Sequence, residues 1–262
     1  MVPDAVDYTE VPHLQEILSY LPINPEDEED IVNYVQNITN LIAVNYKYGQ
    51  YQFAYFGVHL LYMTYIYCTA WKVGQIEPGR YRDAIVFARA YNGRERDLKI
   101  EEADSVFVYS LMPEKEIAKL FKIIDLDRSQ ISLVEDLVDT RNDMAHASGK
   151  FEILTEESYD VKVSSVLSSM GVIHRCMDRL IRKWYGQVLL SFCKGEYEGY
   201  DDPKDFIAEQ MIQTFKLSTN ELLICNEMSV SSLITEHRGY EAKLKTFKKA
   251  LKEYWQEMGY IV

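Results

Sequence analysis

The chain has 262 residues, of which 47% are hydrophobic and 26% are charged, and its formal net charge is −13. A chain of this length can bury a sizeable core, as one large domain or as one domain with an appendage, and its mixed composition excludes a low-complexity polypeptide. The net charge argues against a protein that coats nucleic acid through bulk electrostatics, although it leaves room for a local RNA site.

The negative charge is uneven along the chain. Residues 1–40 contain nine acidic side chains and no lysine or arginine, so they carry nine of the 13 net negative charges. The first ten residues, MVPDAVDYTE, lack the basic start and the apolar core of a signal peptide. We therefore expect a cytoplasmic protein whose residues 1–23 form an acidic N-terminal extension.

The cysteines and histidines form no recognisable redox or metal motif. The cysteines are widely spaced in hydrophobic contexts, which predicts reduced core thiols and also suits the cytoplasm. None of the five histidines has a second histidine or cysteine at ligand spacing. The sequence therefore predicts neither a metal site nor a cofactor. The four cysteines are Cys68, Cys176, Cys193 and Cys225.

Two helices are predicted before residue 50. The first runs from Pro12 to Tyr20 and is ended by Pro22. The second begins at Asn24, an N-cap residue that is followed by a proline and by acids at the positive end of the helix dipole. It continues to about Tyr48, and its predicted buried face consists of Ile31, Tyr34, Val35, Ile38, Leu41 and Ile42.

The segment from Tyr48 to Trp71 contains no charged residue, and it is long enough to raise the question of a membrane span. Membrane helices keep their tyrosines at the two ends, whereas five tyrosines are spread between Tyr51 and Tyr67 in this segment. A helix that is apolar on every side is also typical of the centre of a large bundle. We therefore predict a central helix, with His59 as a hydrogen-bonded core residue, and no membrane span.

The pattern between residues 78 and 129 predicts short helices separated by loops. A turn at Pro78-Gly79 precedes a predicted helix that ends at Asn92-Gly93. Residues 94–104 are predicted to be a solvated charged segment, although three of their basic side chains could contact a phosphate. Residues 106–111 fit a helix or a short strand, residues 113–124 a helix, and Ser129 is the predicted N-cap of the next helix. The three basic side chains are Arg94, Arg96 and Lys99.

The segment VEDLVDTRNDMAHASG, residues 134–149, interrupts an apolar helical stripe with a compact polar group. Asn142 and His146 are four residues apart and share one edge of the helix, while Arg141 lies roughly 140° around from His146. An arginine where the pattern requires an apolar residue breaks the local rule, and such breaks tend to mark functional or strained sites. The simplest alternative is a helix end with an exposed arginine and a histidine near its C-terminus.

A long helix is predicted after Thr155, with Glu156 and Glu157 in its first turn. Its apolar stripe from Val163 to Val188 is the most regular pattern in the chain. The opposite flank carries a basic ridge, which is either a solvated face or an RNA-binding surface. This basic ridge consists of Arg175, Arg179, Arg182 and Lys183.

The segment KGEYEGYDDPKD, residues 194–205, is rich in glycine, acids and turn residues, so a domain boundary is predicted there. Helices are expected from Pro203 to about Lys216, after a capping box of Ser218 and Glu221, and from Gly239 to Met258. The last helix has a lysine-rich side. Residues 218–252 could also form a helix-turn-helix, but the basic side of an amphipathic helix usually only faces solvent.

The segment RNDMAH, residues 141–146, resembles the R-polar-x-x-x-H motif of the HEPN superfamily, whose all-helical domains include many metal-independent ribonucleases. The asparagine after the arginine is the residue that the family favours. The resemblance covers the motif helix and, loosely, residues 24–192. It implies an all-α fold, with a HEPN-like helical bundle at residues 24–193 and a C-terminal helical extension at residues 194–262.

The resemblance also implies an endoribonuclease that cleaves RNA by attack of the 2′-hydroxyl, with Arg141, Asn142 and His146 as catalytic residues. A histidine suits proton transfer near neutral pH. An arginine is always charged and matches phosphate oxygens, so Arg141 would stabilise the transition state. Asn142 would orient either the histidine or the scissile phosphate.

One histidine cannot easily act as both acid and base, and HEPN ribonucleases commonly pair two motifs across a domain dimer, so a homodimer is expected. The roles that are common in this family imply a toxin or an antiviral defence effector, with an antitoxin or regulatory protein as a further partner. A group of HEPN toxins that is paired with nucleotidyltransferase antitoxins has a tyrosine where this chain has Ser148, which puts that pairing in doubt. The alternative is a noncatalytic HEPN-like module that binds a nucleotide or a protein.

Overall fold

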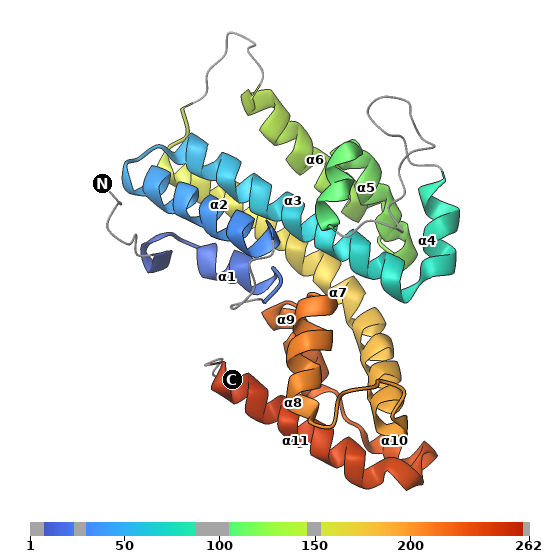
Figure 1. The fold of residues 1–262 in the computed structure, drawn as a ribbon. Coiled ribbons are helices and arrows are strands. Elements are labelled where there is room, and N and C mark those ends of the chain that lie inside the picture. The colour runs from blue at the N-terminus through green and yellow to red at the C-terminus, as the bar shows by residue number, and fades with distance from the viewer. Residues whose placement is uncertain (1–7, 24–29, 87–104, 146–152, 259–262) are drawn as a thin grey trace. The chain divides into compact units, whose positions relative to one another are not determined.

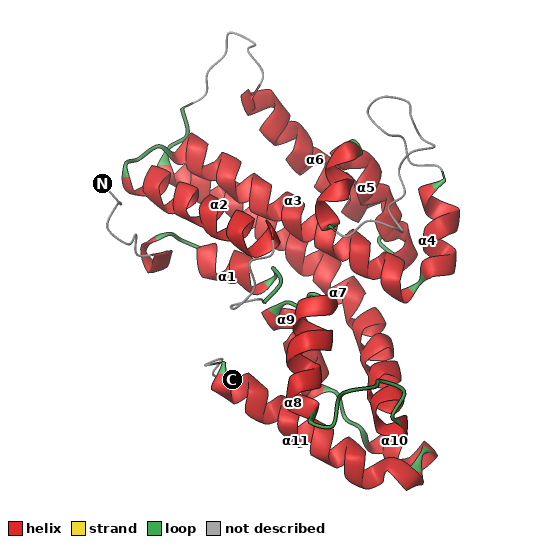
Figure 2. Cartoon of the chain, viewed as in Figure 1, coloured by secondary structure: helices red, strands yellow, loops and turns green. Residues whose placement is uncertain are grey.

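A computed structural model describes residues 8–23, 30–86, 105–145 and 153–258. Every element among these residues is helical, and the described chain contains no strand (Figures 1 and 2). The predicted all-α fold is therefore confirmed. The only strand-like pairing in this part of the chain is an isolated antiparallel bridge between Pro22 and Ser218.

The chain divides into two compact units. Unit 1 lies within residues 1–21 and 28–176, and unit 2 lies within residues 22–27 and 177–262. The division falls inside a single helix, α7 (Glu156–Lys194), which contributes its first part to unit 1 and its last part to unit 2. The domain limits predicted at residues 24 and 194 stay a prediction, because this division does not test which segments fold independently.

Unit 1 contains all the elements before α7. The helix predicted at residues 12–20 is observed as α1, and the uncharged segment 48–71 lies mostly in the long helix α3. Residues 106–111, which fitted either a helix or a strand, form a 3-10 helix. The elements are η1 (Tyr8–Glu10), α1 (Leu14–Ser19), α2 (Asp30–Lys47), α3 (Tyr51–Ile76), α4 (Pro78–Ile85), η3 (Val106–Leu111), α5 (Glu114–Leu120), η4 (Phe121–Ile124) and α6 (Arg128–Ala145).

Helix α3 is the central helix of unit 1, as predicted, and most of its side chains are buried. Its tyrosine hydroxyls are used for packing against α7: that of Tyr62 lies 2.7 Å from Oγ of Ser169, and that of Tyr65 donates to the carbonyl of Met170 (3.1 Å). A Cβ atom on Gly57 would lie 2.5 Å from Cγ1 of Ile42, so glycine allows the close approach of α2.

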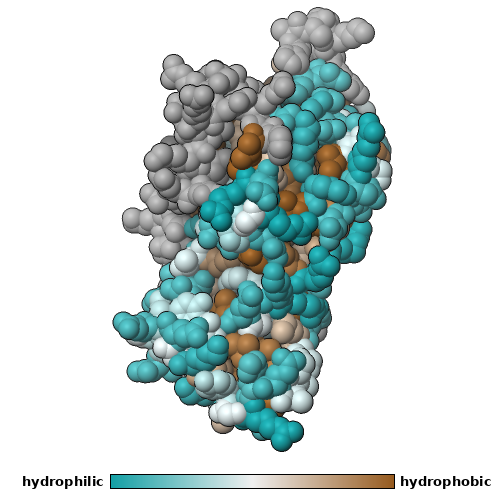
Figure 3. Space-filling view, turned by 90° about the vertical axis from the view of Figure 1, so that its right-hand side faces the viewer, coloured by the Kyte–Doolittle hydropathy of each residue, from teal (hydrophilic) through white to brown (hydrophobic). Residues whose placement is uncertain are grey.

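No helix among the described residues is both long enough and apolar enough to cross a membrane, which agrees with the rejection of a membrane span. On the face drawn in Figure 3, hydrophobic side chains form small, separate patches in a mostly hydrophilic surface. The apolar character of α3 therefore reflects its burial in unit 1, where hydroxyl groups that a lipid would leave unsatisfied find partners.

Two predicted helix boundaries were wrong. Pro78 was expected in a turn, but it lies in the first turn of α4, where its missing N–H costs no hydrogen bond. Ser129 was expected to cap α6, but Asp127 does so. Oδ1 of Asp127 accepts from the backbone N–H of Gln130 (2.9 Å), and the side chain of Gln130 accepts in return from the backbone N–H of Asp127 (2.8 Å).

Several predicted features lie outside the described residues. These are the N-cap at Asn24, the end of the helix expected to reach residue 92, the charged segment 94–104, and the C-terminal part of the motif with His146, Ser148 and Gly149. Helix α6 is described as far as Ala145, so Arg141 and Asn142 lie on its last turn.

Unit 2 packs the last part of α7 against the C-terminal helices. The predicted capping box is confirmed, with Ser218 and Glu221 exchanging both hydrogen bonds at the start of α9. The ring of Trp184 on α7 stacks on Phe215 at 3.7 Å. The elements after α7 are α8 (Pro203–Phe206), the π-helical segment η5 (Ile207–Thr214), α9 (Thr219–Glu227), α10 (Ser231–Glu236), η6 (Arg238–Tyr240) and α11 (Glu241–Glu257).

The lysine-rich side of α11 is largely occupied by contacts within unit 2. Nζ of Lys248 donates to the carbonyls of Cys225 and Asn226 at the end of α9, and burial lowers the pKa of Lys248 to about 8. Nζ of Lys243 donates to the carbonyl of Cys193 (2.9 Å). These two lysines therefore hold helix ends together and do not form a free basic face.

The four cysteines are free thiols, as predicted. Cys68, Cys193 and Cys225 are buried, and Cys176 is half-buried. Burial raises the pKa of Cys176 and Cys193, which keeps these two side chains in the thiol form at neutral pH.

Candidate active site

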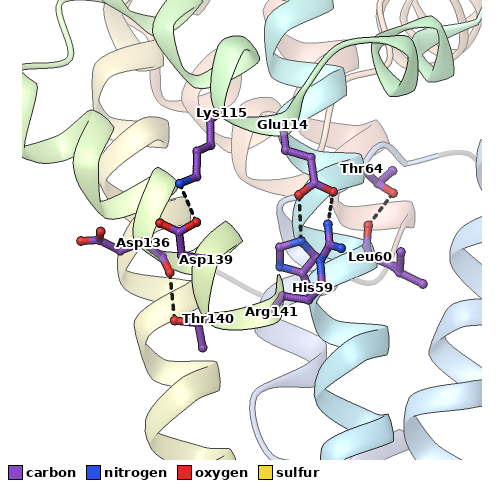
Figure 4. Close-up of polar contacts among 9 residues, drawn as sticks. All are labelled: His59, Leu60, Thr64, Glu114, Lys115, Asp136, Asp139, Thr140 and Arg141. Atoms are coloured by element: carbon purple, nitrogen blue, oxygen red, sulfur yellow. Dashed lines mark hydrogen bonds and ion pairs between the residues drawn. The ribbon is translucent and has the colours of Figure 1, made fainter. Parts of the chain in front are cut away.

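Arg141 projects from the buried face of α6 toward the start of α5. It follows Leu137 and Val138, which are both buried, so its position on the helix directs it inward. Nη2 of Arg141 donates to Oε1 of Glu114, the first residue of α5 (Figure 4). The side chains are 27% and 16% exposed, so this is a partly buried ion pair at the rim of the unit 1 core.

His59, on α3, lies beside the carboxylate of Glu114 (Figure 4). Its side chain is 1% exposed, and Nε2 lies 3.6 Å from Oε2 of Glu114, which is too long for a hydrogen bond. Both ring nitrogens lack a hydrogen-bond partner among the described residues. The prediction of a buried core residue is therefore confirmed, but the hydrogen bond expected for it is not formed.

Glu114 thus sits between a guanidinium and an imidazole, with one carboxylate oxygen facing each of them (Figure 4). Burial by itself raises the pKa of Glu114, but His59 and Arg141 outweigh burial and lower it. Of these two neighbours, only Arg141 carries a permanent charge. The carboxylate therefore stays ionised, and it neutralises the charge of Arg141.

Burial lowers the pKa of His59, although the carboxylate of Glu114 acts in the opposite direction. His59 is consequently a neutral imidazole near pH 7. The three side chains together form a compact cluster with no net charge. We call Arg141, Glu114 and His59 the polar cluster.

A second, exposed ion pair joins the same two helices. Nζ of Lys115 lies 2.5 Å from Oδ1 of Asp139, and the side chains are 40% and 53% exposed. This pair follows the polar cluster by one residue on α5, and Figure 4 shows both pairs bridging α5 and α6. The last two turns of α6 are therefore tied to α5 at two points.

The polar cluster suits phosphate recognition. A guanidinium offers five N–H donors in a planar fork, and the bond to Glu114 fixes the orientation of that plane. Nε of Arg141 is buried and has no hydrogen-bond partner among the described residues. Nη2 is therefore committed to Glu114 and Nε is buried, while the partly exposed remainder of the guanidinium can face a phosphate oxygen.

The predicted catalytic residues are described only in part. Arg141 is held by Glu114, and Asn142 is half-buried on the same turn of α6. His146 lies outside the described residues, so its distance from Arg141 stays a prediction.

The basic ridge on α7 is divided between the two units. Arg175 is exposed in unit 1, while Arg179 and Lys183 are exposed in unit 2. Nε of Arg182 lies 2.8 Å from Oδ2 of Asp178, so its charge is paired within its own helix.

Sequence reasoning missed Glu114 and His59 as parts of the site. Glu114 fell within the helix predicted at residues 113–124, and His59 was assigned only as a core residue. A weak signal was present, because His59 is the one ionisable imidazole in the uncharged segment 48–71. A buried histidine requires a polar neighbour, and α5 supplies one through its first residue.

The burial of His59 predicts a loss of stability in mild acid. Because its pKa is lowered from 6.5 in the folded state, the unfolded chain binds a proton that the folded chain does not. The free energy of unfolding should therefore fall as the pH drops below 6.5, by at most about 1.4 kcal/mol per pH unit, until the folded-state pKa is reached.

Denaturant titrations between about pH 5 and pH 7.5 measure this slope. We expect His59→Gln to flatten it, whereas the control His13→Asn, at an exposed position whose left-handed backbone asparagine tolerates, should leave it unchanged. An unchanged slope in His59→Gln would mean that other groups cause the acid sensitivity.

Comparison of the chain with protein-family models, with curated proteins and with solved structures finds no match. Among the described residues, no group of three or more histidine, cysteine or acidic side chains could hold a metal ion. The case for a function therefore rests on the motif and on the polar cluster.

Proposed function

We propose that this protein is a metal-independent endoribonuclease of the HEPN type, acting in the cytoplasm as a toxin or antiviral defence effector. The observation that carries the proposal is the environment of Arg141. The motif arginine is oriented by a carboxylate from a different helix, at the rim of the core and beside a buried imidazole. An arginine that only extended into solvent from a helix end would need neither neighbour.

In the proposed reaction, the 2′-oxygen of a ribose attacks the adjacent phosphorus and the bond from phosphorus to the 5′-oxygen breaks. The products are a 2′,3′-cyclic phosphate and a 5′-hydroxyl. His146 takes the proton of the 2′-hydroxyl or supplies one to the 5′-oxygen. Arg141 stabilises the charge on the phosphate oxygens, and Asn142 orients the histidine or the phosphate.

A homodimer completes this scheme, because the second proton-transfer group would come from the motif of the other copy. Glu114 acts as a positioning residue that fixes the plane of the guanidinium. The basic ridge, which consists of Arg175, Arg179, Arg182 and Lys183, is proposed to contact the RNA backbone. Arg182 is paired with Asp178 in its own helix, so a phosphate would have to compete with that carboxylate.

The direct test is incubation of the purified protein with total cellular RNA in EDTA. We expect fragments that end in 2′,3′-cyclic phosphate, and we expect His146→Ala to produce none while His13→Asn cleaves like the wild type. Intact RNA at high concentrations of a folded dimer would contradict the proposal. Cleavage that survives in His146→Ala would instead point to a contaminating nuclease or to a different site.

One observation favours a second candidate, a noncatalytic module that binds a nucleotide or a protein. Glu114 neutralises Arg141, so the polar cluster carries no net charge with which to attract a phosphate. Under this alternative, the protein would bind RNA or a nucleotide in EDTA without cleaving it, and Glu114→Gln would strengthen the binding of phosphate-containing ligands.

A further inference from the structure

Unit 2 contains a cavity of about 540 Å³, within the size range of pockets for small molecules. One side is the loop between α7 and α8, and the other is the first half of α11. Aromatic side chains from the end of α7 and from this loop line it, namely Phe192, Tyr197 and Tyr200. None of the sequence motifs accounts for this cavity, and it lies outside the unit that holds the polar cluster.

The aromatic wall is held in place by the core of unit 2. Phe206 is fully buried, and the ring centroids of Phe192, Tyr197 and Tyr200 lie 5.0, 4.7 and 5.4 Å from its own. These edge-to-face and tilted contacts favour one arrangement of the rings. The wall is therefore formed before any ligand arrives.

The hydroxyl of Tyr200 is fixed by the π-helical segment η5. It donates to Oε2 of Glu209 (2.7 Å) and accepts from Nε2 of Gln210 (2.8 Å). A π-helical turn is less favourable than an α-helical one and often occurs at functional sites. Here it places two consecutive side chains so that both contact one tyrosine of the cavity.

The loop also depends on two glycines that line the cavity. Gly195 and Gly199 have φ values of +76° and +87°, a backbone conformation that side chains disfavour. A Cβ atom on either glycine would meet no atom within 4 Å, so backbone conformation and not space requires glycine there.

The charges at the cavity favour a cationic ligand. Glu198 and Asp201 are exposed on the loop, whereas the ammonium of Lys243 donates to the carbonyl of Cys193 at the end of α7. Two carboxylates and one lysine leave a net charge of −1 on the lining, which would repel a phosphate. Aromatic rings attract cations through the negative potential of their faces, and such rings together with carboxylates are the usual receptors of alkylated ammonium groups.

We propose that this cavity binds a small alkylated ammonium compound, with Phe192, Tyr197 and Tyr200 surrounding the cation and Glu198 and Asp201 neutralising its charge. The inference does not rest on the ribonuclease proposal, because it uses only residues of unit 2. It adds a ligand site to the segment that the sequence indicated only as a domain boundary.

The test uses choline as the probe and 3,3-dimethylbutan-1-ol, its uncharged isostere, as the comparison. Ligand-observed NMR titrations of the full chain give both affinities. We expect choline to bind at least about tenfold more tightly than the alcohol. Equal affinities would overturn the proposal, as would tighter binding of a neutral sugar such as methyl glucoside, which also stacks on aromatic rings.

Variants locate the binding. The double variant Glu198→Gln/Asp201→Asn, at exposed positions, should weaken choline about tenfold and leave the alcohol unchanged. Tyr197→Leu should weaken choline as well, although it also removes a contact with Phe206. Glu196→Gln is the matched control, because Glu196 lies on the same loop, pairs with Lys194 (3.6 Å) and does not line the cavity. Choline binding that is insensitive to the double variant would place the ligand elsewhere and refute the assignment.

Discussion

Replacing Arg141 with alanine is expected to slow RNA cleavage in EDTA by at least about 100-fold, because it removes the charge that stabilises the pentavalent phosphate. Arg141→Lys should recover only part of this loss. A lysine keeps the charge, but it is a point donor that cannot hold Glu114 and a phosphate oxygen in one plane. The measurement is the single-turnover rate of formation of 2′,3′-cyclic phosphate ends.

Arg128→Ala is the matched control, since Arg128 is an exposed arginine at the opposite end of the same helix. It should cleave at the wild-type rate. A folded Arg141→Ala protein that cleaves as fast as Arg128→Ala would show that the motif arginine has only a structural role. The Arg141→Lys result separates loss of charge from loss of geometry, so the two arginine variants together test the assigned role.

Local sequence signals predicted most of the fold. The uncharged segment 48–71, apolar on every side, identified the central helix α3. Helical periodicity identified the long helix α7, and a pair of residues three apart identified the capping box at Ser218. These signals are local because each is carried by one continuous segment of the chain. The errors were local as well: Asp127 and Ser129 are both good N-caps two residues apart, and only the structure shows that Asp127 is used.

The partners in the candidate site could not be predicted in the same way. Glu114 is 27 residues from Arg141, and an acid in the first turn of a helix is explained by the helix dipole alone. His59 comes from a third helix, so its position beside Glu114 depends on how α3 and α5 pack. The division within α7 was equally hidden, because its apolar stripe continues without a break across residues 176 and 177.

The ion pair between Glu114 and Arg141 is expected to contribute to the stability of the folded chain. Glu114→Gln should lower the free energy of unfolding by about 1–3 kcal/mol, because Arg141 then keeps its charge at a partly buried position with a weaker acceptor. Solvent screening at the 27% exposed guanidinium favours the lower half of this range. The pKa of Glu114 is lowered, so this stabilisation is present above its ordinary value of 4.5 and is lost as the pH falls through the folded-state pKa.

Arg141→Met alone should be destabilising for the complementary reason, since it leaves the carboxylate of Glu114 beside His59 without a cation. Combining it with Glu114→Met should restore the wild-type stability or exceed it, because two apolar side chains avoid the desolvation cost of a partly buried ion pair. Denaturant titrations of the two single variants and the double variant form the cycle. The exposed pair of Lys115 and Asp139 is the comparison, and its removal should change stability little.

The double variant connects stability with function. If it is as stable as the wild type but does not cleave RNA, the ion pair is not needed for folding, and its retention at the rim of an apolar core has to be explained by the reaction. If the losses in free energy of unfolding that the two single variants show simply add in the double variant, the coupling between Glu114 and Arg141 is absent in solution. In that case Glu114 does not orient the arginine, and its assignment as a positioning residue fails.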